Sequence, residues 1–241
     1  MPILHNRSTL LFVISAALTL SACGGGSSDN PIHVPELTKG LCFDNGIYAS
    51  GASYKLNFKE GTASPVVSGS VLATNASFNG VPDLVQFVET TSNTVSIVVT
   101  RYLKPLSPQA AFTQPSSVVA LYGTEAAQGS QSFTTTTYTP PYEDRRVELG
   151  VGETRTFTGQ GTRTEMFPPN SGPHTRQDQV KFVGVESITL PAGTFTACRY
   201  EVNGNTTEWL HRSLVVRRDI SGGESRILQS GELNGTPLKS Q

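Results

Sequence analysis

The sequence predicts an all-β protein whose sheet is antiparallel and strongly curved. Charged residues make up only 15% of the chain, while Thr, Ser and Gly are abundant, a composition typical of exported strand-rich proteins. Short segments that alternate apolar and polar side chains recur between Gly, Asn and Pro residues. Beyond the N-terminal leader, no segment keeps a 3.6-residue apolar period long enough for a core helix.

The predicted N-terminal half of the body, residues 39–138, contains the clearest alternating patterns. Tyr54, Leu56 and Phe58 alternate with polar residues, which predicts a half-buried strand. The segment 94–102 is apolar on both faces, which predicts a central strand covered on each side. Further strands are predicted at 65–73, 83–89, 117–123 and 132–138, and a short helical turn at 107–112.

The predicted C-terminal half, residues 139–241, begins at a Pro-Pro segment, 139–146, which reads as a stiff seam between the halves. Along 180–190 the apolar face switches between Phe182 and Val183, which predicts a bulge near Gly184 and a bent strand. Strands are predicted at 147–157, 180–190, 198–202, 209–219 and 225–233, with a hairpin at 190–195, a turn at 203–204 and a loop at 166–177.

The order of motifs in the second half is similar to that of a known protein family. Its order is Leu149-x-Val-Gly-Glu-x-x-x-Phe, Val183-Gly-Val-Glu, Leu190-Pro-Ala-Gly-Thr-Phe, a strand with Trp209, and Leu214-Val-Val-Arg. Over residues 145–233 this resembles a family of largely uncharacterised bacterial periplasmic or outer-membrane β-meander proteins. The resemblance implies a curved antiparallel sheet forming an open cup or partial barrel, and it is silent on function.

The chain differs from this family at one position, and its first half repeats part of the family's pattern. Ser213 stands where the family usually has Gly, so the last turn is expected to differ. Residues 46–102 repeat the same order more faintly, which suggests two related halves packed together.

The N-terminus predicts a lipid anchor. Residues 10–20 form an apolar run that is too short to span a bilayer, which needs about 20 apolar residues. Leu20-Ser21-Ala22-Cys23 resembles the lipobox of bacterial lipoproteins, which implies a signal peptide at 1–22 and a diacylglycerol-modified, acylated Cys23. The alternative is an ordinary secretory signal followed by an incidental cysteine.

The residues after Cys23 predict how the body is held. The Gly/Ser-rich segment 23–38 is expected to be a flexible tether. Gly24 replaces the Asp that favours inner-membrane retention in such lipoproteins, so the outer membrane is expected.

The other two cysteines, Cys42 and Cys198, lie near opposite ends of the body. In an oxidising compartment such a pair is most simply a disulfide, and two buried free thiols are the alternative. The formal net charge of −1 argues against nucleic acid as a partner, because a phosphate-backbone binder would be basic.

The search for chemistry finds no catalytic residues, no cofactor site and no convincing metal site. There is no Gly-x-Ser-x-Gly elbow and no Ser-x-x-Lys pair. His174 and Asp178 are four residues apart in a predicted loop, so a solvated loop is favoured over zinc ligation. Trp209 and His211 share one strand face, and packing is favoured over lining a cup interior.

The mixed-sign clusters 143–146 and 217–219 are interpreted as self-neutralising surface. Paired acids for glycoside hydrolysis stay open, because their spacing in space is not readable from sequence. Sequons at Asn75, Asn205 and Asn234 carry no meaning in a bacterial lipoprotein.

Three functions remain for a membrane-anchored envelope protein of this kind. The leading hypothesis is a non-enzymatic binding module for an apolar ligand, a lipid or an envelope partner. The second is an accessory of a surface, pilus or secretion assembly that uses exposed strand edges. The third, a hydrolase of envelope polymers, has the least support in the sequence.

Overall fold

The computed structural model describes residues 39–93, 95–106, 118–128, 131–166 and 168–238. The predicted signal peptide 1–22, the tether 23–38 with Cys23, and the helical turn at 107–112 lie outside these residues. Within the described ranges, no helix has the length and apolar character needed to cross a membrane.

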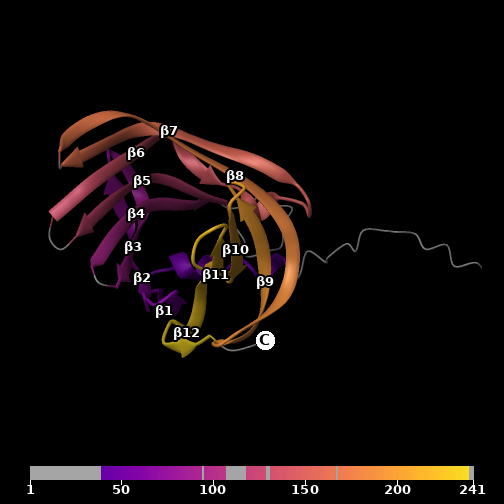
Figure 1. Ribbon diagram of the computed structural model, residues 1–241. Coiled ribbons are helices and arrows are strands. Elements are labelled where there is room, and N and C mark those ends of the chain that lie inside the picture. The colour runs from indigo at the N-terminus through magenta and orange to yellow at the C-terminus, as the bar shows by residue number, and fades with distance from the viewer. Residues whose placement is uncertain (1–38, 94, 107–117, 129–130, 167, 239–241) are drawn as a thin grey trace, which may run out of the picture. The chain divides into compact units, whose positions relative to one another are not determined.

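The body is one antiparallel sheet of thirteen strands that closes on itself (Figure 1). In chain order the elements are η1 (Asn45–Tyr48), β1 (Ser53–Glu60), β2 (Val66–Phe78), β3 (Val81–Ser92), β4 (Ser96–Leu106), β5 (Val118–Gln128), β6 (Gln131–Asp144), η2 (Arg146–Glu148), β7 (Thr154–Met166), β8 (Pro169–Leu190), β9 (Gly193–Val202), β10 (Thr206–His211), β11 (Leu214–Ile220), β12 (Arg226–Leu233) and β13 (Thr236–Pro237). Each strand pairs with its sequence neighbour, and β1 also pairs with β12, from Tyr54↔Leu233 to Glu60↔Arg226.

The prediction of an all-β, strongly curved antiparallel sheet is therefore confirmed, and the curvature continues to closure. Instead of an open cup or two packed sheets, twelve strands form a closed ring, and β13 adds two residues beside β12. Closure follows from the β1–β12 pairing, which joins the first and the twelfth strand by backbone hydrogen bonds.

The local bends of the second half lie where the sequence predicts them. The β8–β9 register shifts between Phe182 and Gly184, and Gly184 has φ of 152°, so the predicted bulge is present. Leu190 pairs with Gly193 across the predicted hairpin. Asn203 and Gly204 both have positive φ in the turn between β9 and β10.

Two predictions about single elements fail. The expected loop at 166–177 is part of the β7–β8 hairpin, which is paired from Thr154↔Lys181 to Met166↔Pro169. Residues on both sides of the predicted boundary at 138 belong to β6, whose register with β5 shifts between Thr137 and Tyr142, around two prolines that have no N–H to donate; the division into two halves stays a prediction. The strand predicted as covered on both faces, β4, leaves Ile97 49% exposed.

The segment before β1 bridges the inside of the ring. Cys42 forms a disulfide with Cys198 of β9, with a Cα–Cα distance of 5.6 Å, and both residues are fully buried. At the other end of the segment, the ring of Tyr48 lies 6.0 Å from that of Phe87 on β3. Because β3 and β9 lie far apart around the ring, this segment fills part of the interior between them.

Candidate functional site

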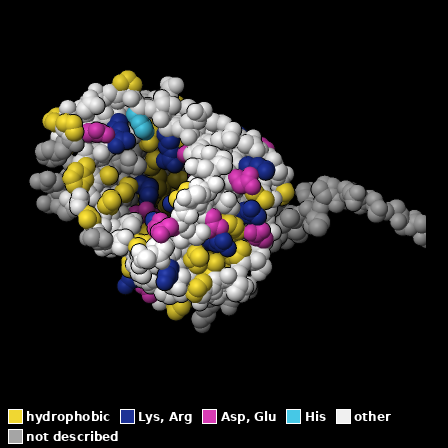
Figure 2. All heavy atoms as spheres, in the orientation of Figure 1, with side chains coloured by type: hydrophobic (Ala, Val, Ile, Leu, Met, Phe, Trp, Pro, Cys, Tyr) yellow, Lys and Arg dark blue, Asp and Glu magenta, His cyan; other side chains and the backbone are white. Residues whose placement is uncertain are grey.

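A cavity of about 320 Å³ lies inside the closed sheet. Its lining comes from η1 and η2, from β4, β5 and β6, and from β8, β10 and β11 on another part of the ring, so the walls meet across the interior. Figure 2 shows a hollow in this face of the body, with Lys or Arg and hydrophobic side chains inside it. The lining residues used below are Tyr48, Arg101, Leu103, Val119, Leu121, Tyr142, Asp144, Arg146, Arg176, Glu208, Leu210, Ser213 and Arg218.

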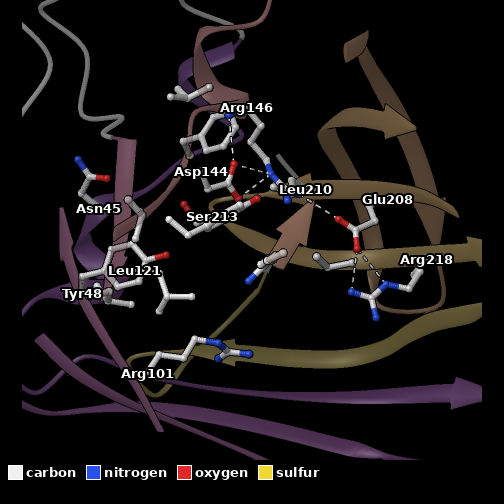
Figure 3. A pocket seen from close by; sticks show the side chains of 17 residues that line it. Asn45, Tyr48, Arg101, Leu121, Asp144, Arg146, Glu208, Leu210, Ser213 and Arg218 are labelled. Atoms are coloured by element: carbon white, nitrogen blue, oxygen red, sulfur yellow. Dashed lines mark hydrogen bonds and ion pairs between the residues drawn. The ribbon is translucent and has the colours of Figure 1, made fainter. Parts of the chain in front are cut away.

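One wall of the cavity is an ion-pair network around Glu208 (Figure 3). Glu208 Oε1 accepts hydrogen bonds from Nε and Nη2 of Arg218, at 3.0 and 2.7 Å. Its other oxygen accepts a bond from Nη1 of Arg146 at 3.1 Å, and Asp144 lies 2.9 Å from Nε of the same arginine. These contacts occupy both oxygens of Glu208 and hold Arg146 between two carboxylates.

The network keeps its charges although it is largely removed from water. The side chains of Arg146 and Glu208 are 15% and 10% exposed. Burial opposes the charge of Arg146, but Asp144 and Glu208 outweigh it and raise the pKa of the guanidinium above its usual range. A buried charge of this kind is tolerated because it is paired.

Arg101 of β4 enters the cavity from another wall (Figure 3). Its Nη2 donates to Glu89 Oε1 at 3.0 Å, and the Tyr54 hydroxyl donates to the other oxygen of Glu89. Burial works against the charge of Glu89, but Arg101 and the hydrogen bond from Tyr54 outweigh it and lower the pKa of the carboxyl. The Glu89 carboxylate is therefore ionised and occupied on both oxygens.

The Tyr48 hydroxyl is the least engaged polar group of the lining. Within the described ranges it makes no hydrogen bond. Burial, followed by the negative charge of Asp144, raises the pKa of Tyr48 to about 12, so the hydroxyl keeps its proton at neutral pH. A protonated hydroxyl facing the cavity is a hydrogen-bond donor for whatever enters it.

The β8 wall adds a stacked arginine. Arg176 lies 4.2 Å above the Tyr142 ring and donates from Nε to Asp178 at 2.8 Å. The Tyr142 hydroxyl donates to the same carboxylate oxygen at 2.7 Å. Burial opposes ionisation of Asp178, but these two donors prevail and lower its pKa.

The structure does not support His174 and Asp178 as a metal site. Both lie on β8, with Arg176 between them on the same face. Four residues of extended strand separate their Cα atoms by about 13 Å, which is too far for one ion. Among the described side chains, no three His, Cys, Asp or Glu groups come together as metal ligands.

Trp209 and His211 pack, as the sequence analysis favours. Trp209 donates from Nε1 to Glu186 and lies between the guanidinium groups of Arg199 and Arg217. His211 is 2% exposed, its Nδ1 is 2.9 Å from the carbonyl oxygen of Thr196, and its ring contacts Phe195. Neither residue lines the cavity.

The interpretation of the two charge clusters as surface is right for two residues of each and wrong for the others. Arg145 pairs with Glu143 and Glu148, and Arg217 with Asp219, on exposed or half-exposed positions. Asp144, Arg146 and Arg218 instead turn into the cavity. Neighbouring residues of a strand point to opposite faces, so one cluster supplies both environments.

Sequence reasoning also misses Arg101 and Glu208, which lie in or beside predicted strands, and Arg176, which lies in the predicted loop 166–177. A charged residue on the inward face of an alternating strand is the signal that could have identified Arg101, which directly precedes buried Tyr102 and Leu103. Ser213 has φ of 65°, a conformation that favours glycine, and its hydroxyl accepts a bond from the Asp44 amide.

Comparisons with known proteins leave the cavity unassigned. No protein-family model matches the chain. No curated protein is significantly similar to it. Among solved structures, the chain is similar to a "putative lipoprotein" from Parabacteroides distasonis ATCC 8503, with 13% identity and a TM-score of 0.37 over 80% of this chain and 98% of that chain. That description names neither a ligand nor a reaction.

Proposed function

We propose that this chain is a lipid-anchored protein of the bacterial cell envelope whose closed sheet binds a small molecule without transforming it. The cavity carries the proposal. Its volume of about 320 Å³ is in the range of small-molecule sites, and its lining mixes aliphatic side chains such as Val119 and Leu121 with charged groups. This lining is amphipathic, and so fits a ligand with both polar and apolar parts better than the apolar ligand of the leading hypothesis.

The carboxylates of the cavity support a binding role over catalysis. Asp144 and Glu208 are both held by arginines, and Glu89 behind Arg101 has a lowered pKa. A general acid needs a carboxyl that keeps its proton near neutral pH, which an arginine partner opposes. The geometry therefore favours holding a ligand over acid–base chemistry.

An assembly role finds less support in the fold. Strand addition needs a free sheet edge, and the pairing of β1 with β12 uses the backbone groups that an open sheet would offer. The short β13 covers part of β12 as well. No specific contact or surface among the described residues favours this alternative.

The anchor belongs to the same proposal and rests on the lipobox-like sequence ending at Cys23. Two or more acyl chains hold a protein stably because each buried methylene contributes about 0.8 kcal/mol. We expect radiolabelled palmitate to enter the wild-type protein in cells, and the protein to fractionate with the outer membrane. Cys23→Ser should abolish the label and release the protein, and a labelled Cys23→Ser protein would contradict the anchor.

Filling the cavity tests the binding role. Val119→Trp adds an indole to the lining, whereas Val151→Trp places the same side chain on a position that is 59% exposed. We expect native mass spectrometry to find a bound small molecule on the wild type and on Val151→Trp, and none on Val119→Trp. An empty wild-type protein, or equal loading of both variants, would contradict the proposal.

A further inference from the structure

The hydrogen-bonding groups left over in the cavity are donors. Arg101 uses one N–H of its guanidinium on Glu89, and its Nε and Nη1 make no hydrogen bond to any described residue. The Tyr48 hydroxyl is also unengaged within those residues. The three carboxylates here already accept bonds: Glu208 receives three N–H groups, Glu89 receives Arg101 and Tyr54, and Asp144 receives the backbone N–H and Nε of Arg146.

The two unengaged donors belong to residues that both neighbour Phe87. Tyr48 packs its ring on Phe87, and Phe87 is the residue that pairs with Arg101 between β3 and β4. Figure 3 shows Tyr48 with Leu121 on one side of the cavity and the guanidinium of Arg101 directed into the space between them and Arg218. Both donors line this one cavity, so a single ligand can occupy the space beside them.

We infer that the ligand of this cavity carries an anionic group, a carboxylate or a phosphate monoester, that accepts hydrogen bonds from Arg101 and Tyr48. Its apolar body lies against Leu103, Leu121 and Leu210. This inference rests on the proposed binding function and specifies the chemistry of the ligand. The volume admits on the order of ten non-hydrogen atoms, because a water-sized group takes about 30 Å³.

Other ligand classes fit the lining less well. A cationic ligand would need carboxylate lone pairs that the arginines already use, and it would add charge beside Arg146 and Arg218. A purely apolar ligand would remove water from Arg101 and Tyr48 and give them no partner, which costs binding energy. An anion replaces that water with charge-assisted hydrogen bonds.

Matched eight-carbon probes test the inference by isothermal titration calorimetry. The protein is the exported full chain carrying Cys23→Ser, which keeps acyl chains out of the assay. We expect octanoate or octyl phosphate to bind at least roughly tenfold more tightly than neutral octanamide, because charge-assisted hydrogen bonds are the stronger ones. The two acids then tell whether a carboxylate or a phosphate is preferred.

Variants locate the anionic group. Arg101→Gln should weaken the preferred acid roughly tenfold or more, Tyr48→Phe roughly fivefold, and neither should change octanamide binding. Arg217→Gln, outside the cavity, is the matched control and should leave both unchanged. Circular dichroism and thermal unfolding show that each variant is folded, and Tyr48→Phe keeps the test valid if loss of Arg101 impairs folding.

The titrations distinguish failure of the anionic-ligand inference from failure of the proposed binding function. Equal affinity for octanamide and both acids, or acid binding that survives both cavity variants, would overturn the anionic ligand while the binding cavity stands. No binding of any probe by the folded wild type would overturn the anionic ligand together with the proposed function.

Discussion

The two faces of β10 differ more than their sequence suggests. Glu208, Trp209, Leu210 and His211 are consecutive and all buried. Glu208 and Leu210 line the cavity, whereas Trp209 and His211 pack on the opposite side against Glu186 and Phe195. One face of the strand lines the cavity, and the other face is covered by packed side chains.

The difference lies in how each face satisfies its polar atoms. Ion pairs with two arginines hold the Glu208 carboxylate in place, and the cavity lies beside it. Trp209 and His211 each use one hydrogen bond and are otherwise surrounded by side chains. A cavity with paired charges can stay open because the ion pairs fix its wall, whereas an aromatic wall is stabilised by contact.

The largest expected effect comes from breaking the charged face. Glu208→Ala leaves Arg146 without one of its two carboxylates and Arg218 without its partner. Because removing one partner of a buried ion pair strands the other, we expect a loss of about 3 kcal/mol in the free energy of unfolding. Urea denaturation followed by circular dichroism measures this loss.

A double variant that restores the charge balance, and a control at a surface ion pair, test whether the stability loss comes from the buried charges. Adding Arg218→Met to Glu208→Ala should restore part of the lost stability, because the double variant also removes the arginine whose ion-pair partner is Glu208. Asp219→Ala, which breaks the half-exposed pair with Arg217, should cost about 0.5 kcal/mol. Equal costs for Glu208→Ala and Asp219→Ala would mean that the two faces of β10 do not differ in this way.

Much of the fold was predictable because alternation and turn residues are local signals. The bulge at Gly184 and the hairpin at Leu190–Gly193 follow from a switch of apolar face and from Pro and Gly placement. Closure was not predictable, since it depends on β1 meeting β12 at a sequence separation that leaves no local trace. The β7–β8 hairpin was missed because both faces of Pro169–Gln179 are polar.

Alternation along the sequence identifies the strands, but it does not show which charged residues line the cavity. In the cluster 143–146, Asp144 and Arg146 turn inward while Glu143 and Arg145 form a surface pair. Which parity faces inward depends on bulges such as the β6 shift before Tyr142, and the sequence alone does not give their positions. The charged residues of this cluster are therefore evident in the sequence, but which of them face the cavity is not.

The smallest expected effect comes from the packed face of β10. Burial, opposed by the bond to Thr196 and assisted by Arg212, lowers the pKa of His211 below its usual 6.5. Below pH 6.5 the unfolded chain therefore binds a proton that the folded chain does not, so stability falls as the pH drops.

The slope that His211 adds cannot exceed about 1.4 kcal/mol per pH unit, and it ends below the folded pKa. Denaturation curves between pH 7.5 and pH 4.5 measure it, and His211→Phe should remove this contribution while keeping the contact with Phe195. His174→Gln, on β8, is the control and should leave the contribution in place. An unchanged pH profile in His211→Phe would show that the packed face of β10 carries no titrating group, and the contrast between its two faces would then be one of shape alone.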